Sequence, residues 1–204
     1  MQEKPNEHNL NELLDANNGY ITRRQIDEAN ISSWFLTDFV RKRGLVKIDK
    51  GFYALPSWIC DDFLVFQYKY PKFIFSYLSA LYLNKLTDSL PSFFEVTGPK
   101  NYRPLTNFLG EVVVHTDSRN DVYELGISEV KTNLGYTVRS YDKERTICDI
   151  IRNSNKIDSE IYVKALHLYK KNPAKDINTL MQYARKMGIQ KKVSDVLTVV
   201  LNED

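Results

Sequence analysis

The side chains able to do chemistry are few in this sequence and lie far apart. Its three histidines, His8, His115 and His167, match no metal-binding spacing and have no acidic partner in register. Its two cysteines, Cys60 and Cys148, form no CxxC pair, which argues against a zinc ribbon or a disulfide scaffold. Neither a glycine-rich phosphate loop nor a GxSxG motif is present.

Four acidic residues, Asp61, Asp62, Glu95 and Asp117, are of the type that holds magnesium in nucleases, but nothing in their spacing singles them out. Because no set of catalytic side chains converges, we expect no enzyme, no cofactor and no metal. An enzyme fused to a DNA-binding module stays as a hypothesis. It requires carboxylates clustered around Asp61 or Asp117 in the folded chain.

The sequence favours phosphate binding instead. Between Gly19 and Pro56 there are seven basic residues against four acidic ones. Neutralising phosphates supplies the part of DNA affinity that does not depend on sequence. The net charge of the whole chain is only +2, so a nucleic-acid surface has to be local.

Two short helices are predicted to position these charges. Thr22 can cap a helix from Arg23 to about Ala29, and Ser32 can cap a second from Ser33 to about Arg43. Gly44 stands where a helix commonly ends in a left-handed residue. In the second helix a 3.6-residue period separates an apolar side (Phe35, Leu36, Phe39, Val40) from an outward side (Ser33, Trp34, Thr37, Arg41, Lys42).

A β-hairpin is predicted to follow. The segment LVKIDKGFYAL has two short runs of apolar and polar alternation around Asp49-Lys50-Gly51. With a first helix over residues 10–17, this order predicts a winged helix-turn-helix over residues 1–57, a fold that reads duplex DNA. The alternatives are a small packing domain with a solvated charged face and a winged helix that makes protein contacts. The predicted DNA-binding residues are Arg23, Arg24, Ser32, Ser33, Trp34, Thr37, Arg41, Lys42, Lys47 and Lys50.

Residues 58–204 are predicted to form a second domain, which makes the chain α+β. The aromatic stretch 63–70 suits a strand or a helix, and Ser76 can cap a buried helix to Asn84. Strands are expected at 93–97, 111–115, 123–130 and 136–141, so a small sheet occupies about 63–141. A helix capped by Asp142 then runs to about Arg152, with Cys148 as an apolar core residue, and amphipathic helices complete residues 142–204 as a bundle.

The outward positions of the C-terminal helices are basic. From Glu160 to Asp204 there are eight basic residues against five acidic ones. The basic residues are Lys164, Lys170, Lys171, Lys175, Arg185, Lys186, Lys191 and Lys192. They predict either a solvated face or a second docking surface for an acidic protein or nucleic acid. The basic loop 98–104 likewise suits phosphate contact, a partner or a solvated turn.

The sequence begins with no basic and apolar signal segment and contains no apolar run of about 20 residues, the length that a membrane span needs. We therefore expect a cytoplasmic protein with no membrane partner. No heptad run predicts a coiled-coil dimer, so we expect a monomer that binds paired half-sites cooperatively.

Five segments together resemble the AbiEi family, the antitoxins and transcriptional repressors of bacterial type IV abortive-infection (phage-defence) toxin–antitoxin pairs. They are GYITRRQI, RKRGLVKIDKGFYALP, SALYLNKLTD, FFEVTGPKNYR and DKERTICDIIR. The resemblance extends from about Asn11 to the C-terminal helices, and it depends on the conjunction of these segments in this order.

The resemblance implies two separable roles. The winged helix would bind inverted repeats in the promoter of its own operon and repress it, with Arg23 and Arg24 on phosphates and Lys47 and Lys50 as contacts of the wing. The basic C-terminal helices would belong to the domain that counteracts an AbiEii-like nucleotidyltransferase toxin, without a stable complex. A stand-alone regulator that senses a small ligand is the alternative, and an apolar pocket would favour it.

Overall fold

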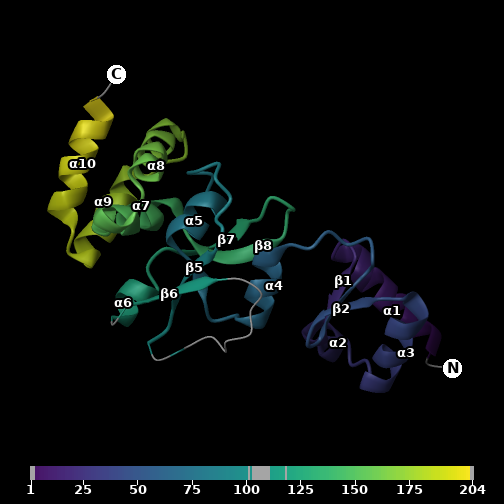
Figure 1. The fold of residues 1–204 in the computed structure, drawn as a ribbon. Coiled ribbons are helices and arrows are strands. Elements are labelled where there is room, and N and C mark those ends of the chain that lie inside the picture. Colours follow the sequence, from purple (N-terminus) through teal and green to yellow (C-terminus); the bar gives the residue numbers. More distant parts are fainter. Residues whose placement is uncertain (1–2, 101, 103–110, 118, 203–204) are drawn as a thin grey trace. The chain divides into compact units, whose positions relative to one another are not determined.

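The computed structural model describes residues 3–100, 102, 111–117 and 119–202 (Figure 1). The chain divides into two compact units, Met1–Val65 (unit 1) and Phe66–Asp204 (unit 2). The division falls inside helix α4 (Asp62–Lys69), later in the chain than the boundary that the sequence suggests at residue 57. The stretch 63–70, which suits a strand or a helix by sequence, is therefore largely helical.

Besides the start of α4, the described residues of unit 1 form three helices and a three-stranded antiparallel sheet. Both predicted caps are confirmed: Thr22 forms a reciprocal capping box with Gln25, and the Ser32 hydroxyl accepts from the Phe35 amide. The Gly44 φ of 64° ends its helix in the left-handed region, as expected. The helices are α1 (Glu3–Ala16), α2 (Arg23–Glu28) and α3 (Ser33–Arg43), and the strands are β1 (Tyr20–Thr22), β2 (Val46–Asp49) and β3 (Phe52–Ala54).

The predicted hairpin is confirmed as β2 and β3, with Gly51 at a φ of 76° in its turn. Two features of unit 1 differ from expectation. Helix α1 begins at Glu3, well before Leu10, although only Leu10 and Leu14 of its inward stripe are fully buried. Strand β1, which the sequence does not signal, pairs with β3, so the sheet order is β1-β3-β2.

Unit 2 has a mixed five-stranded sheet in the order β6-β5-β4-β8-β7. Its strands are β4 (Ile74–Phe75), β5 (Phe94–Gly98), β6 (Val112–Thr116), β7 (Ile127–Lys131) and β8 (Thr137–Tyr141). The pairs β5–β6 and β4–β8 are parallel, and β4–β5 and β7–β8 are antiparallel. The central two-residue strand β4 was not predicted, because it is too short to show alternation.

One predicted strand is wrong at its start. Residues 120–123 form a short helix, α6 (Asn120–Tyr123), and the strand expected from Tyr123 begins only at Ile127. The intervening Gly126 has a φ of 76°, which breaks the extended backbone. The expectation for the basic loop 98–104 falls mostly on residues outside the described part of the chain.

Helix α7 (Lys143–Arg152) is the centre of the helical part (Figure 1). It packs against α5 (Tyr77–Leu83), α8 (Ser159–Lys171), α9 (Ile177–Met187) and α10 (Gln190–Asn202), and a short 3-10 turn (Ser154–Lys156) follows it. Asp142 caps α7 as expected, by accepting from the Arg145 amide at 2.7 Å. Ser76 stands at the start of α5 but gives no capping bond, since its hydroxyl accepts instead from Thr97 at 3.0 Å.

Gly126 fixes the approach of α7 to the sheet, and its substitution tests this packing. A Cβ there would lie 2.6 Å from the Arg145 Cβ and 3.2 Å from both Asp142 carboxylate oxygens. Gly126→Ala should therefore lower the free energy of unfolding by about 2–4 kcal/mol, from backbone strain plus the clash. Gly135→Ala is the matched control: its φ of 88° imposes similar strain, but nothing lies near its Cβ. Equal losses in urea denaturation would contradict the packing argument.

In the described part of the chain no helix has both the length and the apolar character that a membrane crossing requires.

Candidate nucleic-acid interface

Arg23 joins the three elements of unit 1 that the sequence selects for DNA contact. Its backbone amide donates to the Gly51 carbonyl in the hairpin turn at 2.6 Å. Its guanidinium Nη1 donates to the Ser33 hydroxyl at 2.7 Å, at the start of α3. The start of α2, the start of α3 and the hairpin turn therefore lie together. Pairing of Thr22 with Phe52 fixes the same arrangement through the sheet.

The outward side of α3 is exposed as predicted. Ser33, Trp34 and Thr37 are exposed, and Trp34 retains 70% of its accessible surface. The Thr37 hydroxyl donates to the Ser33 carbonyl one turn earlier, at 2.9 Å. The opposite side is packed, with Leu36 and Phe39 buried in the core of the unit. The helix thus presents exposed polar side chains, with Trp34 among them, from its capped end onward.

Each of the four helical cations predicted for DNA contact has an acidic neighbour. Arg23 pairs with Asp27 at 2.8 Å and Arg24 with Glu28 at 2.9 Å, each one turn apart. A single carboxylate, that of Asp38, forms salt bridges with both Arg41 and Lys42, each at 2.7 Å. Hydrogen bonds from Lys42 and Arg41 hold the pKa of the Asp38 carboxyl below its usual value.

These ion pairs are exposed on their basic side, so they contribute little stability and exchange readily for another anion. Because Arg41 and Lys42 share one carboxylate, the last turn of α3 keeps an excess of positive charge. Lys47 and Lys50 add exposed cations on the hairpin. All ten residues predicted for DNA contact therefore lie in one unit, on α2, on α3 and its cap, or on the hairpin.

The basic residues of the C-terminal helices fall into two groups. Lys170, Lys171 and Lys175 lie around the start of α9, whereas Arg185, Lys186, Lys191 and Lys192 lie around its end and the turn at Gly188. Helix α9, which is eleven residues or about 16 Å long, runs from one group to the other. Lys164 lies apart on α8, where its ammonium pairs with Asp88 at 2.7 Å.

Some of these lysines also hold the fold. Lys192 Nζ donates to the Arg152 carbonyl at the end of α7 and to the Ser154 hydroxyl. Lys175 Nζ lies 3.5 Å from the Asn172 carbonyl. Lys171, Arg185, Lys186 and Lys191 are exposed.

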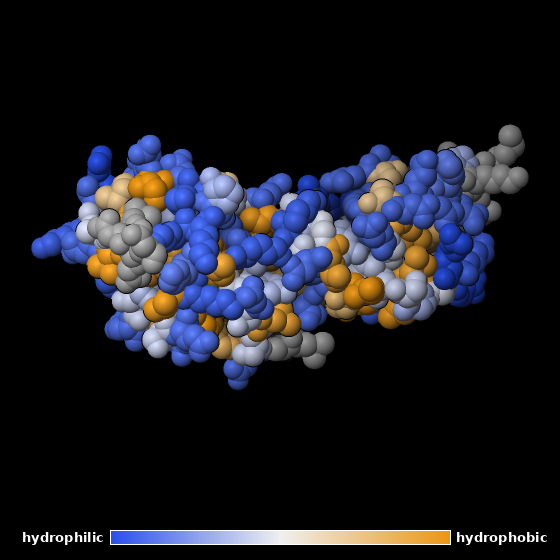
Figure 2. Space-filling model, turned by 90° about the horizontal axis from the view of Figure 1, so that it is seen from above, coloured by the Kyte–Doolittle hydropathy of each residue, from blue (hydrophilic) through white to orange (hydrophobic). Residues whose placement is uncertain are grey.

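Hydrophilic residues cover most of the face of the molecule shown in Figure 2, and hydrophobic residues form small separate groups there.

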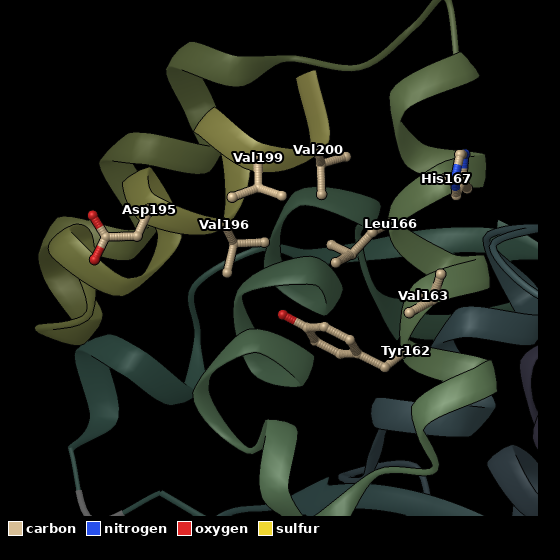
Figure 3. A pocket seen from close by; sticks show the side chains of 8 residues that line it. All are labelled: Tyr162, Val163, Leu166, His167, Asp195, Val196, Val199 and Val200. Atoms are coloured by element: carbon tan, nitrogen blue, oxygen red, sulfur yellow. The ribbon is translucent and has the colours of Figure 1, made fainter. Parts of the chain in front are cut away.

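An apolar groove of about 420 Å³ lies between α8 and α10. Figure 3 shows Tyr162 and Leu166 extending from α8 toward Val196 and Val200 of α10, whereas Asp195 points away. Two of its valines, Val163 and Val199, are more than half exposed.

The side chains weighed for catalysis are placed as follows. Burial raises the pKa of the Cys148 thiol to about 12, as suits an apolar core residue, and burial and Asp62 raise that of Cys60 to about 11. Asp61 caps α4 by accepting from the Leu64 amide. Among the described residues no group of three or more histidine, cysteine or acidic side chains is placed to hold a metal ion.

The expectation that the histidines lack acidic partners is wrong for two of them. His8 lies 3.2 Å from Glu12, one turn along α1. His115 Nε2 lies 3.0 Å from Glu95 Oε1 because the parallel register of β5 and β6 brings them to the same face of the sheet. This partner cannot be found from spacing along the chain.

Sequence reasoning also missed the buried charges of α7. Arg145 and Asp149 are each 1% exposed, and Arg145 Nε donates to Asp149 Oδ2 at 3.1 Å. Arg145 Nη1 donates to the carbonyls of Val122 and Leu125. Burial raises the pKa of Asp149, and the guanidiniums of Arg145 and Arg152 oppose that rise.

Asp117, a candidate metal ligand by residue type, lies beside this network. Its Oδ2 accepts from Arg152 Nη1 at 3.3 Å, and Arg152 Nη2 lies 3.4 Å from Asp149 Oδ1. Asp117 and Asp149 therefore contact the same guanidinium. Each carboxylate faces a guanidinium, however, which differs from the shared cation site of a magnesium nuclease.

No protein-family model and no curated protein matches this chain. Among solved structures, the crystal structure of the RV2827C protein from Mycobacterium tuberculosis is similar, with a TM-score of 0.47 and 13% sequence identity. The alignment covers 88% of this chain and 76% of that one.

Proposed function

We propose that this protein is an antitoxin of the AbiEi type, a DNA-binding repressor of its own operon that also counteracts a nucleotidyltransferase toxin. Unit 1 would act as a winged helix-turn-helix, with α3 in the major groove and the β2–β3 hairpin as the wing. The observation that supports this most is the junction at Arg23. It brings the starts of α2 and α3 and the hairpin turn together beside the exposed polar side chains of α3.

The start of α3 has the side chains that contact with base edges requires. Recognition helices contact base edges through residues near their N-terminus, while flanking basic side chains and helix N-termini hold the phosphates. Ser33, Trp34 and Thr37 occupy the first positions, and Arg41 and Lys42 the last turn. Phosphates would replace Asp38 as the partner of those two cations.

An operator-binding assay tests the repressor role. The DNA directly upstream of the gene should bind tightly, in preference to random duplex, with affinity that falls steeply as salt rises. Two adjacent half-sites should fill cooperatively if the monomer binds inverted repeats. Weak binding with no preference for that DNA would leave unit 1 as a protein-contact module.

Thr37 tests base contact separately from phosphate contact. Thr37→Ala should relax base preference at one operator position by about 1–3 kcal/mol and leave affinity for random DNA nearly unchanged. Binding to an operator set randomised at each position measures this. Thr198→Ala is the matched control, since Thr198 makes the same bond to a carbonyl one turn earlier at 2.9 Å. A uniform loss across all positions would assign Thr37 to backbone contact.

The C-terminal helices would provide the antitoxic surface. Changing Lys170, Lys171, Lys191 and Lys192 to glutamate should impair toxin neutralisation in a growth-rescue assay and leave operator affinity intact. Because Lys192 also ties α10 to the end of α7, a companion variant should change only Lys170, Lys171 and Lys191. Loss of operator binding in the companion would show that the two surfaces are not separable.

A regulator that senses an apolar ligand is the second candidate, and the groove between α8 and α10 favours it. Operator affinity that changes on adding an apolar ligand would support it, and an adjacent nucleotidyltransferase gene would count against it.

A further inference from the structure

Unit 2 contains a polar cavity of about 320 Å³ that the proposed function does not use. Its floor is the carboxyl end of the parallel pair β5–β6, where Thr97 faces His115 and Gly98 faces Thr116. In α/β proteins, ligands bind outside the carboxyl ends of parallel strands, because the loops that follow them can diverge there. Helices α5 and α7 supply the other walls.

The lining is rich in hydrogen-bond donors. Thr97, His115 and Thr116 contribute from the strands. Tyr77, Arg145, Arg152 and Asn153 contribute a phenol, two guanidiniums and an amide from the helices. Asp117 is the acid among the lining residues, and Arg152 and the Arg119 amide already bond to it. A cavity of this kind complements an acceptor-rich ligand, and an oxyanion is the most acceptor-rich group of small size.

The balance of charge limits how much negative charge the ligand can carry. The two guanidiniums at the cavity already face two carboxylates: Arg145 pairs with Asp149, and Arg152 contacts both Asp117 and Asp149. A polyphosphate would meet these carboxylates without enough compensating charge. A single phosphoryl group can instead replace Asp117 at the partly exposed guanidinium of Arg152, as an exchange of one oxyanion for another.

Tyr77 provides a second, independent feature at the same place. It has a φ of 46°, in the left-handed region that an aromatic residue rarely adopts. The Asn153 side-chain amide donates to the Tyr77 hydroxyl at 2.9 Å. The centroid of the Tyr77 ring lies 4.1 Å from that of the His115 ring. Backbone strain of this kind persists where the surroundings fix it, and it concentrates at ligand sites.

From this geometry we propose that the cavity binds a small molecule bearing one phosphoryl group. The phosphate is held by Arg152 with the Thr116 hydroxyl, and the remainder lies along the Tyr77–His115 pair. The volume is at the small end of ligand pockets, so the ligand has the size of a sugar phosphate or a mononucleotide.

Titration calorimetry of the whole protein with four probes tests the proposal: inorganic phosphate, ribose 5-phosphate, AMP and adenosine. The phosphorylated probes should bind and adenosine should not. Tighter binding of ribose 5-phosphate or AMP than of phosphate would identify a phosphorylated metabolite. Equal binding of all three would identify free phosphate as the ligand. Failure of every phosphorylated probe, or equal binding of adenosine and AMP, would overturn the proposal.

Two variants locate the site. Arg152→Gln should weaken binding of the phosphate-bearing probes at least tenfold. Arg139→Gln is the control: it removes a half-buried guanidinium that donates to the Pro71 carbonyl, and it should leave this binding unchanged. Because Arg152→Gln also removes a partner of Asp149, Thr116→Glu serves as a second test. Thr116 is exposed at the end of β6, so the change places a negative charge at the cavity without disturbing the core.

Thr116→Glu should abolish binding of the phosphorylated probes, and Thr137→Glu, at an exposed position on β8, should leave it unchanged. Far-ultraviolet circular dichroism verifies folding of each variant. Binding that survives in folded Thr116→Glu protein would place the phosphate elsewhere and overturn the assignment of this cavity.

Discussion

Replacing Arg41 and Lys42 together by alanine should weaken binding to every DNA sequence and flatten its salt dependence. A side-chain cation that neutralises a phosphate releases the counterions bound to the DNA there, and this release makes binding depend on salt. Removing two such cations should therefore lower the magnitude of the slope of log K against log salt by about 1.8, or roughly 0.9 for each contact. Preference among sequences should change little, because neither residue is assigned to a base edge. Fluorescence anisotropy with operator and random duplexes over a salt series measures both quantities.

The chain offers a matched control for this variant. Arg185 and Lys186 occupy the last turn of α9, which ends at Gly188 in the left-handed region just as α3 ends at Gly44. Arg185→Ala with Lys186→Ala therefore removes the same charges from the same kind of helix end, in unit 2. If the two double variants weakened DNA binding equally, the overall positive charge of the protein rather than the surface of α3 would explain the binding.

Asp38 allows the same hypothesis to be tested with the opposite sign. Its carboxylate neutralises part of the charge of Arg41 and Lys42 in the free protein. Asp38→Asn should therefore strengthen binding to random and operator DNA alike and steepen the salt dependence. Unchanged affinity in both Asp38→Asn and the Arg41/Lys42 double variant would exclude this face of α3 from the DNA interface.

Arg145→Ala should destabilise unit 2 by about 3–5 kcal/mol, the typical loss when one partner of a buried ion pair is removed. Asp149 would remain in a site that is 1% exposed with Arg152 as its cation, and the carbonyls of Val122 and Leu125 would lose their donor. Urea denaturation followed by circular dichroism should show the loss. Both tryptophans, Trp34 and Trp58, lie in unit 1, so their fluorescence transition should be unaffected.

A double variant separates the charge effect from the loss of packing. Arg145→Ala with Asp149→Ala removes both buried charges and should recover part of the stability lost in Arg145→Ala alone. Arg139→Ala is the control for loss of an arginine at a half-buried site. If the double variant were less stable than Arg145→Ala by the full cost of Asp149→Ala, the two charges would not be coupled.

Unit 1 shows how far local sequence signals reach. Caps, a left-handed glycine and a clear period fixed the bounds of α3 to the residue, because each depends on chain neighbours alone. The outward row from Ser33 to Lys42 followed from the same period. The junction at Arg23 could not be predicted, since it joins a backbone amide to a carbonyl in a distant hairpin turn.

Unit 2 shows where such signals fail. The apolar residues of α7 predicted a buried helix, but nothing in the sequence shows that Arg145 and Asp149 are buried with them. Their burial depends on carbonyls and carboxylates from other elements. The cavity beside them is likewise a product of strand register, which places Glu95 and His115 on the same face of neighbouring strands.

The central position of α7 also bears on how the protein can diverge. Glu144 accepts from the Tyr169 hydroxyl of α8 and from the Asp176 amide before α9, and Lys192 of α10 reaches the last turn of α7. Recombination that exchanged the C-terminal helices as a block would leave these polar groups of α7 in the core without partners. New partner specificity in this lineage should therefore arise by point substitution at exposed positions of α8, α9 and α10, while the helices themselves are inherited with the sheet.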